Sequence, residues 1–278
     1  MFLIFIFLLG LATGSFLNVV ICRLKTKESI LFGYSHCTQC KHKLAWYDLI
    51  PLVSFVLTRG RCRYCGKKIS WQYPTVELAT ALLFTLVFYK QFNNLATQQF
   101  ALLLYCSIAL LLFYVSVLIV IFVYDLKHNI IPDKIVISGI VVAVLGNLVF
   151  DLLHNPKSYS IFSGQLSFIN YRSISGLIAA LAASGFFYLL VVIPKGHWMG
   201  GGDVKLALFM GLILGWPNIL VGLFGAFISG AIIGLILVGL NKKTMKSQVP
   251  FGPFLCASTI VAMLYGSQII NWYLSLVF

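Results

Sequence analysis

Long apolar runs, separated by short polar segments, follow one another along almost the whole chain. A helix needs about 20 apolar residues to cross the hydrocarbon layer of a bilayer, which is about 30 Å thick. The pattern therefore predicts about eight membrane crossings. The runs cover residues 1–22, 75–89, 97–124, 135–153, 174–193, 204–215, 218–240 and 251–276.

Composition agrees with this pattern, because 60% of the residues are hydrophobic, only 10% are charged and the mean hydropathy is +0.97. The core of a soluble protein of 278 residues does not require so much apolar surface. We predict an all-α polytopic membrane protein with a small metal-bound cytoplasmic loop domain. Its expected parts are a first transmembrane helix (1–22), the loop domain (23–74) and a transmembrane core (75–278). The first run lacks a preceding basic stretch and a small-residue cleavage site, which favours a retained helix over a signal peptide.

The positive charges fall mainly in alternate segments between the runs. Of the 20 Lys and Arg residues, ten lie in residues 23–68, two in 127–134, two in 195–205 and three in 242–246. Cytoplasmic loops of membrane proteins are enriched in Lys and Arg, so we predict that both termini lie outside and residues 23–74 in the cytoplasm. This distribution accounts for the net charge of +13 without a nucleic-acid partner.

Four cysteines form two Cys-x-x-Cys pairs in the loop domain, with 21 residues between the pairs. They are Cys37, Cys40, Cys62 and Cys65. This spacing is typical of zinc-ribbon and treble-clef sites. A segment of about fifty residues buries little apolar surface and therefore needs a bound metal or another cross-link to stay folded. Four thiolates leave no open coordination position, so we predict a structural ion, zinc or a similar metal.

Other states of these cysteines stay open. Two disulfides are one alternative, although a reducing cytoplasm disfavours them, and free thiols are another. His36 and His42 flank the first pair and can replace a cysteine ligand, but a solvated or supporting role is the simpler expectation.

Acidic side chains are scarce, which narrows the choice of catalytic groups. The chain has seven of them: Glu28, Asp48, Glu77, Asp125, Asp133, Asp151 and Asp203. Asp125 follows the run 97–124 and Asp203 precedes the run 204–215, both at predicted cytoplasmic ends. The run 204–215 spans only about 18 Å, so we expect Asp203 to be drawn into the bundle, where it needs water or a partner. Asp125 is the partner that we predict.

Two carboxyl groups held close together retain one proton between them. The ionised carboxylate can take a proton from a water that attacks a peptide carbonyl, while the protonated one supports the oxyanion, so proteolysis needs no metal. Gly200, Gly201 and Gly202 allow close backbone approach and positive φ angles, which suits an extended peptide substrate beside Asp203. The alternatives are an N-cap role for Asp203 and a polar helix end at Asp125.

Two functions of other classes compete with a peptidase. A transporter can use buried acids to carry protons or to bind a cation, and midplane acids with inverted repeats would favour it. A non-catalytic scaffold whose metal loop binds a partner leaves the acid pair unexplained.

The motifs around the two aspartates resemble the active-site motifs of the type 4 prepilin peptidases, which are leader peptidases of the GxGD aspartyl-protease class. The matching segments are Tyr124-Asp125 followed by Ile131-Pro132-Asp133, and Gly200-Gly201-Gly202-Asp203-Val204-Lys205. The resemblance also includes Gly14-Ser15-Phe16-Leu17-Asn18-Val19, the second cysteine pair and Pro250-Phe251-Gly252-Pro253-Phe254, and it covers nearly the whole chain. Thr38 departs from the family, which often has proline there, but this leaves the four cysteines intact.

The resemblance implies an enzyme of the bacterial inner membrane that removes the short basic leader of type IV prepilins, or of pilin-like secretion or competence subunits. Cleavage follows a glycine on the cytoplasmic side. Many members also methylate the new amino terminus with S-adenosylmethionine, and the cysteine loop resembles that longer form. The sequence has no Gly-rich turn after a strand, so no Rossmann-type cofactor site can be identified. Glu77 is a candidate for contact with the basic leader or for the methylation site, or else a charge favoured at a helix N-terminus.

Overall fold

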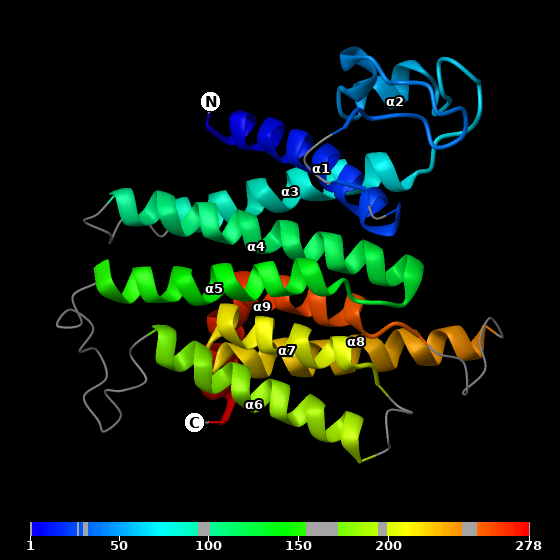
Figure 1. The fold of residues 1–278 in the computed structure, drawn as a ribbon. Coiled ribbons are helices and arrows are strands. Elements are labelled where there is room, and N and C mark those ends of the chain that lie inside the picture. Colours follow the sequence, from blue (N-terminus) through cyan, green and yellow to red (C-terminus); the bar gives the residue numbers. More distant parts are fainter. Residues whose placement is uncertain are drawn as a thin grey trace. The chain divides into compact units, whose positions relative to one another are not determined.

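The computed structural model describes residues 2–26, 28–29, 33–93, 101–153, 172–193, 199–240 and 249–277. Within these residues the chain is helical, with two isolated β-bridges and no strand (Figure 1). The long helices are α1 (Phe2–Thr26), α3 (Gln72–Asn93), α4 (Ala101–His128), α5 (Asp133–Leu153), α6 (Arg172–Val192), α7 (Gly201–Leu214), α8 (Asn218–Gly239) and α9 (Gly252–Val277). A short 3-10 helix η1 (Trp46–Leu49) and the helix α2 (Val53–Leu57) lie in the loop between α1 and α3.

Each predicted apolar run corresponds to one of the long helices. Six of these helices, α1, α4, α5, α6, α8 and α9, are long and apolar enough to cross a membrane within the described residues. The other two are α3 and α7, and the 14 residues of α7 span only about 21 Å. The protein is a multi-pass membrane protein. Residues 97–100, residues 195–198 of the basic segment 195–205, and the whole basic segment 242–246 lie outside the described residues.

The chain forms two compact units, residues 1–120 and 121–278. In the first unit, α1 packs along α3 at very short range, because glycines of α1 face the α3 backbone. A Cβ atom added at Gly10 would lie 2.6 Å from the Ala81 Cα, and one at Gly14 would lie 2.7 Å from the Glu77 Cα. Small residues of this kind let membrane helices approach closely where dispersion replaces the hydrophobic effect.

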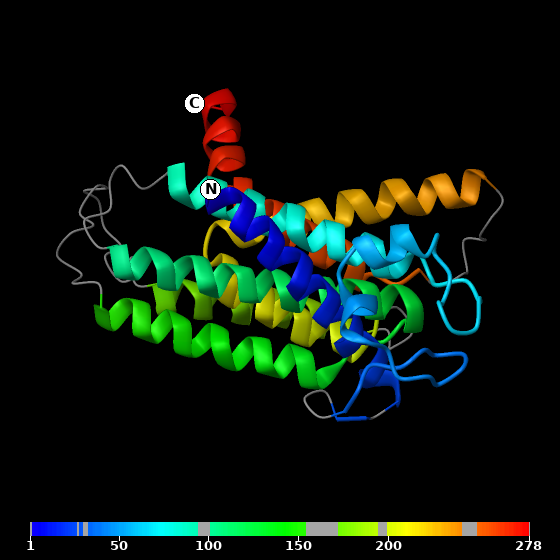
Figure 2. The same ribbon diagram turned by 90° about the horizontal axis from the view of Figure 1, so that it is seen from above.

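In the second unit, α7 is the central helix and packs against α5, α6, α8 and α9 (Figures 1 and 2). Its residues from Phe209 to Leu214 are all buried, as expected for a helix that is apolar on every side. Asn147 of α5 donates its side-chain N–H to the Leu212 carbonyl oxygen at 2.9 Å. The later part of this short helix is therefore enclosed by the longer ones, and in its first turn the buried residue is Asp203.

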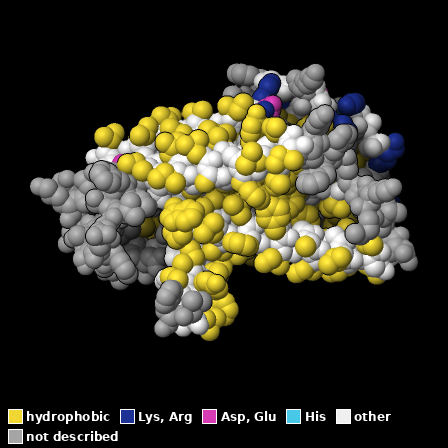
Figure 3. Space-filling view, turned by 90° about the horizontal axis from the view of Figure 1, so that it is seen from below, with side chains coloured by type: hydrophobic (Ala, Val, Ile, Leu, Met, Phe, Trp, Pro, Cys, Tyr) yellow, Lys and Arg dark blue, Asp and Glu magenta, His cyan; other side chains and the backbone are white. Residues whose placement is uncertain are grey.

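The outer surface carries many large apolar side chains, and Figure 3 shows hydrophobic side chains across much of the described part of one face. Leu152 of α5, Leu181 of α6 and Leu235 of α8 are all more than 60% exposed. Contiguous apolar surface of this kind is unusual on soluble monomers. It fits helices whose outer faces contact lipid.

The close contact of α7 with α6 predicts that a methyl group added at Gly211 destabilises the folded protein. A Cβ at Gly211 would overlap the backbone of Ala180, so Gly211→Ala must push the two helices apart. We expect it to destabilise the folded protein by about 1–3 kcal/mol, the usual cost of overpacking. Thermal unfolding in detergent measures this cost. Gly185→Ala, in α6 where a Cβ meets no atom within 4 Å, is the control; equal stability of the two variants would contradict the packing.

Candidate active site and metal centre

Asp125 lies in the last turn of α4, and its side chain is only 4% exposed. The helix ends at Asn129, which has a φ of 51° and donates its backbone N–H to the Asp125 carbonyl oxygen at 2.8 Å. This left-handed residue is a common helix stop. It turns the chain into Ile130-Ile131-Pro132, and α5 begins directly afterwards at Asp133. The turn fixes the Asp125 carboxyl group beside the connection from α4 to α5.

Asp203 is the third residue of α7 and is 8% exposed. Its carboxylate accepts the backbone N–H of Gly200, and its own N–H donates to the Gly200 carbonyl oxygen at 3.2 Å. This reciprocal pair resembles a capping box and satisfies backbone groups that the first turn of a helix leaves unpaired. The expected burial of Asp203 is confirmed. The alternative N-cap role is wrong, because Gly200 is the N-cap and Asp203 is the third residue of the helix.

The two aspartates lie close enough for the charge of Asp125 to act on Asp203. Both charges also act on Cys256, a fully buried thiol in the second turn of α9. Ile131 packs between the helix ends, because a Cβ at Gly202 would lie 3.0 Å from its Cβ and one at Gly252 would lie 3.4 Å from its Cδ1. The end of α4 and the starts of α7 and α9 therefore meet around one apolar side chain.

Gly252 is a site residue that sequence reasoning did not single out. It is the first residue of α9, and its backbone N–H donates to the Asp125 carboxylate. A Cβ at this position would lie 2.5 Å from the Asp125 Oδ2, so only glycine lets the backbone reach the carboxyl group. The segment Pro250-Phe251-Gly252-Pro253-Phe254 is part of the family resemblance, but nothing in the sequence connects it with Asp125.

The glycines before Asp203 differ from expectation in one respect. Gly200 has a φ of −84° and a ψ of 151°, and Gly201 and Gly202 form the first turn of α7. The expected positive φ angles are therefore wrong, and α7 begins three residues before the predicted run 204–215. The helix extends backwards because the Asp203 carboxylate accepts the Gly200 N–H. What the structure requires of Gly202 is its small size against Ile131.

Glu77 lies in the first unit, in the second turn of α3, and is 7% exposed. Its Oε2 accepts the backbone N–H of Leu52 at 2.9 Å, and its carboxylate also accepts the hydroxyl of Ser15 in α1. Glu77 thus joins both helices to the loop domain. Its contact with a substrate stays a prediction.

The four loop cysteines gather in one cluster, in which all the sulfur atoms lie within 4.8 Å of one another. All four are free thiols. A tetrahedral ion with metal–sulfur bonds of about 2.3 Å would place sulfur atoms about 3.8 Å apart, so the donor set and its size fit a metal ion such as zinc. His36 and His42 are not part of the cluster, and the His42 ring instead stacks on Tyr64 with centroids 3.8 Å apart.

The two cysteine pairs adopt the same backbone turn. Cys37 and Cys62 each accept an N–H from the residue four positions on, Lys41 at 2.9 Å and Gly66 at 2.8 Å. Lys41 and Gly66 have φ angles of 60° and 68°. Each turn is closed by an isolated β-bridge, His36 with Lys43 and Arg61 with Lys68. Two equivalent half-sites thus face each other, as the repeated spacing predicts.

Hydrogen bonds favour the thiolate that a metal requires. Burial alone would raise the pKa of the Cys37 thiol. Hydrogen bonds from the backbone of Cys40 and Gln39 and from the thiols of Cys40 and Cys62 outweigh this effect, so the pKa falls below its ordinary value, to about 7. A lowered pKa increases the thiolate fraction at neutral pH and so favours metal binding. The turn of the first pair and the thiol of Cys62 in the second pair thus both favour the Cys37 thiolate.

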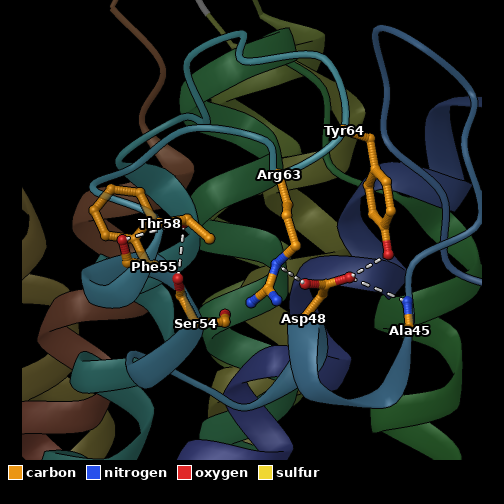
Figure 4. Close-up of polar contacts among 7 residues, drawn as sticks. All are labelled: Ala45, Asp48, Ser54, Phe55, Thr58, Arg63 and Tyr64. Carbon is orange, nitrogen blue, oxygen red and sulfur yellow. Dashed lines mark hydrogen bonds and ion pairs between the residues drawn. The ribbon is translucent and has the colours of Figure 1, made fainter.

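A polar cluster beside the second pair holds η1 against the metal loop (Figure 4). Asp48 of η1 pairs with the Arg63 Nε at 3.2 Å and accepts the Tyr64 hydroxyl at 3.0 Å and the Ala45 N–H at 3.2 Å. Hydrogen bonds with Tyr47 and Asp48 raise the Tyr64 pKa to about 12. Arg63 and Tyr64 are the two residues between Cys62 and Cys65, so this cluster braces the half-site directly.

Two family models match the chain, the Bacterial Peptidase A24 N-terminal domain at residues 8–91 and the Type IV leader peptidase family at residues 112–235. A prepilin leader peptidase/N-methyltransferase from Bacillus subtilis is 31% identical over 272 residues, which are 98% of this chain and 97% of that protein. The chain belongs to the type IV leader peptidase family. Proteins of the same name from Legionella pneumophila and Pseudomonas aeruginosa are 31% and 28% identical, and each alignment covers 96% of this chain, with 92% and 91% of the relative.

Within this leader peptidase family member, the first model covers α1, the cysteine loop and most of α3, whereas the second covers both aspartates. Gly252 lies beyond the region of either model. No solved structure gives a significant match. The relatives named above are peptidases, so the comparisons give the transporter alternative no support.

The cysteine cluster predicts a bound ion that depends on all four thiols. We expect Cys62→Ser to lose most of the metal that the purified full-length protein carries, because one of four thiolates is replaced by a weak ligand. Elemental analysis of the purified protein measures the metal content. Cys106→Ser, at an exposed cysteine of α4, should keep the wild-type content; an unchanged content in Cys62→Ser would contradict the four-cysteine site.

Proposed function

We propose that this protein is a membrane aspartyl endopeptidase that cleaves the leader peptide of type IV prepilins or pilin-like secretion or competence subunits. We further propose that it methylates the new amino terminus, as the names of its relatives state for those proteins. The observation that supports the proposal is the burial of Asp125 and Asp203 at helix ends that approach each other around Ile131, in a member of the leader peptidase family.

In the proposed mechanism, Asp125 and Asp203 hold one proton between them, because two charged carboxylates at short range in a low-dielectric bundle repel strongly. The ionised carboxylate takes a proton from a water molecule as its oxygen attacks the scissile carbonyl. The protonated carboxyl donates a hydrogen bond to the developing oxyanion and then gives its proton to the leaving amine. The pair ends with one proton, ready for another cycle.

The backbone groups around the pair keep the carboxyl groups in position. The Gly252 N–H holds Asp125 and the Gly200 N–H holds Asp203, so each carboxylate has a donor on a rigid helix terminus. Donors fixed before the reaction need no reorganisation during it. Gly200 and Gly201 are exposed, and we propose that Gly200, Gly201 and Gly202 form the edge along which an unfolded peptide passes Asp203.

The remaining assignments follow from charge and composition. We propose that the ion in the cysteine cluster is zinc with a structural role, since four thiolates leave no position for water. The enzyme lies in the bacterial inner membrane with its aspartates on the cytoplasmic side, where the basic segments belong. S-adenosylmethionine is the proposed methyl donor, and no residue is assigned to its binding.

The proposal predicts loss of cleavage when either carboxyl is replaced. Asp125→Asn and Asp203→Asn each remove one member of the pair, so we expect cleavage to fall by about 10²–10⁴-fold, the usual contribution of general acid–base catalysis. Co-expression with a prepilin and mass analysis of its mature amino terminus measure cleavage and methylation together. Asp133→Asn is the matched control, because Asp133 is an exposed acid paired with Lys205 at 2.8 Å. Normal cleavage by either of the first two variants would reject the assignment.

Gly252→Ala should lower the rate of cleavage and leave substrate binding almost unchanged. The added methyl group would displace the Asp125 carboxyl, and a misplacement of about 1 Å costs about 100-fold in rate. The measurements are kcat and KM for a prepilin in detergent, with Gly234→Ala of α8, where a Cβ meets nothing, as the control. A full kcat in Gly252→Ala would show that the close approach is not needed.

A further inference from the structure

The helix α2 carries an apolar face that no described residue covers. Val53, Val56 and Leu57 are 50%, 70% and 73% exposed, and Trp71, just before α3, is 74% exposed. Phe55 of α2 packs on the Trp71 ring with centroids 5.2 Å apart, so Trp71 lies against α2. We call the four exposed residues Val53, Val56, Leu57 and Trp71 the α2 face.

A hydrogen bond fixes the level of α2 along the membrane helices. The Leu52 N–H, one residue before α2, donates to Glu77 at 2.9 Å, and Glu77 also accepts the hydroxyl of Ser15 in α1. Ser15 lies eleven residues before the end of α1, which corresponds to about 16 Å of helix. Since α1 is long and apolar enough to span a bilayer, α2 begins beside the span and not beyond its end.

The segment that leads into α2 also has the character of a membrane interface. Residues 49–57 contain no charged side chain. Apolar stretches too short to cross a bilayer are typical of re-entrant or interfacial segments. Tryptophan, like Trp71 here, is enriched at the membrane–water interface, because its ring is apolar and its N–H needs a polar partner.

Basic side chains follow α2 directly. Arg59, Arg61 and Lys68 are exposed, and within the described residues none of them has an acidic partner. Residues 33–74 contain seven Lys and Arg residues and one acid, Asp48, which pairs with Arg63. Four thiolates around a divalent ion would add two negative charges and still leave this segment positive. The surface beside the α2 face therefore favours an anionic partner.

We propose that the α2 face is a lipid anchor, with Val53, Val56, Leu57 and Trp71 at the boundary between headgroups and acyl chains. Arg59, Arg61 and Lys68 bind the phosphates of anionic phospholipids. Apolar burial and attraction to anionic lipid together stabilise interfacial segments of this kind. Because Leu52, directly before α2, is hydrogen-bonded to Glu77 of α3, the lipid surface also holds the loop domain against α1 and α3.

The test places Trp71 in a bilayer of known composition. Full-length protein is reconstituted in nanodiscs of phosphatidylcholine and phosphatidylglycerol whose acyl chains carry bromine near the headgroup. The emission of Trp71 is taken as the difference between wild type and Trp71→Phe. We expect strong quenching of this difference by the brominated lipid and weak quenching by aqueous iodide.

Two pairs of variants test the two parts of the surface. Val56→Ser with Leu57→Ser should lose most of the lipid quenching of Trp71, whereas Tyr34→Ser, at another exposed aromatic of the loop, should retain it. Arg59→Ser with Arg61→Ser should lose the extra quenching that phosphatidylglycerol gives over pure phosphatidylcholine. Lys43→Ser is the control, because its ammonium group lies over the Tyr34 ring, 3.1 Å from the centroid. Metal content shows that each variant keeps its cysteine site.

Quenching of Trp71 by iodide and not by brominated lipid would overturn the proposal and show a face exposed to water or to a protein partner. Equal quenching in wild type and in the Val56/Leu57 variant would also overturn it, since the apolar face would then not set the depth of Trp71. Neither readout depends on leader cleavage, so the result stands apart from the proposed function.

Discussion

The burial of two carboxyl groups among lipid-embedded helices is the constraint on which the second unit depends. Lipid offers no hydrogen-bond donor, so each carboxylate must find one in the protein. Asp125 and Asp203 find theirs in the backbone N–H groups of Gly252 and Gly200, beside the starts of α9 and α7. The positions of three helix termini, the end of α4 and the starts of α7 and α9, follow from this requirement.

A glycine is present at each point where two helices, or a helix and a buried side chain, approach closely. Gly202 admits Ile131, Gly252 admits the Asp125 carboxyl group, and Gly211 lets α6 lie against the short α7. In the first unit, Gly10 and Gly14 do the same for α1 and α3. The hydrophobic effect contributes little to the association of helices in lipid, so close contacts of this kind stabilise the bundle. The buried carboxyl groups lie in the interior that these contacts create.

Much of this arrangement follows from the sequence, for physical reasons that differ between its parts. Helix positions are predictable because the bilayer imposes a length on apolar runs, and the cysteine cluster is predictable because two equal spacings make two equal half-sites. Scarcity of acids singles out Asp125 and Asp203, and the shortness of the run 204–215 predicts the burial of Asp203. Their catalytic role remains a proposal.

Other features depend on contacts between residues far apart in the chain, which no local pattern reveals. The hydrogen bond from the Gly252 N–H to Asp125 joins the start of α9 to the end of α4. The hydrogen bond from the Leu52 N–H to Glu77 joins the loop domain to α3. The early start of α7 was missed because glycine has a poor helix propensity, which the hydrogen bond of Asp203 with Gly200 overrides.

The pH dependence of kcat/KM for leader cleavage tests the shared proton most directly. Two coupled carboxyl groups, one of which must be ionised and the other protonated, predict a bell-shaped profile whose limbs are the two apparent pKa values of the pair. A rate that rises through one ionisation and then stays level to high pH would contradict the acid–base pair, because a single carboxylate would then suffice.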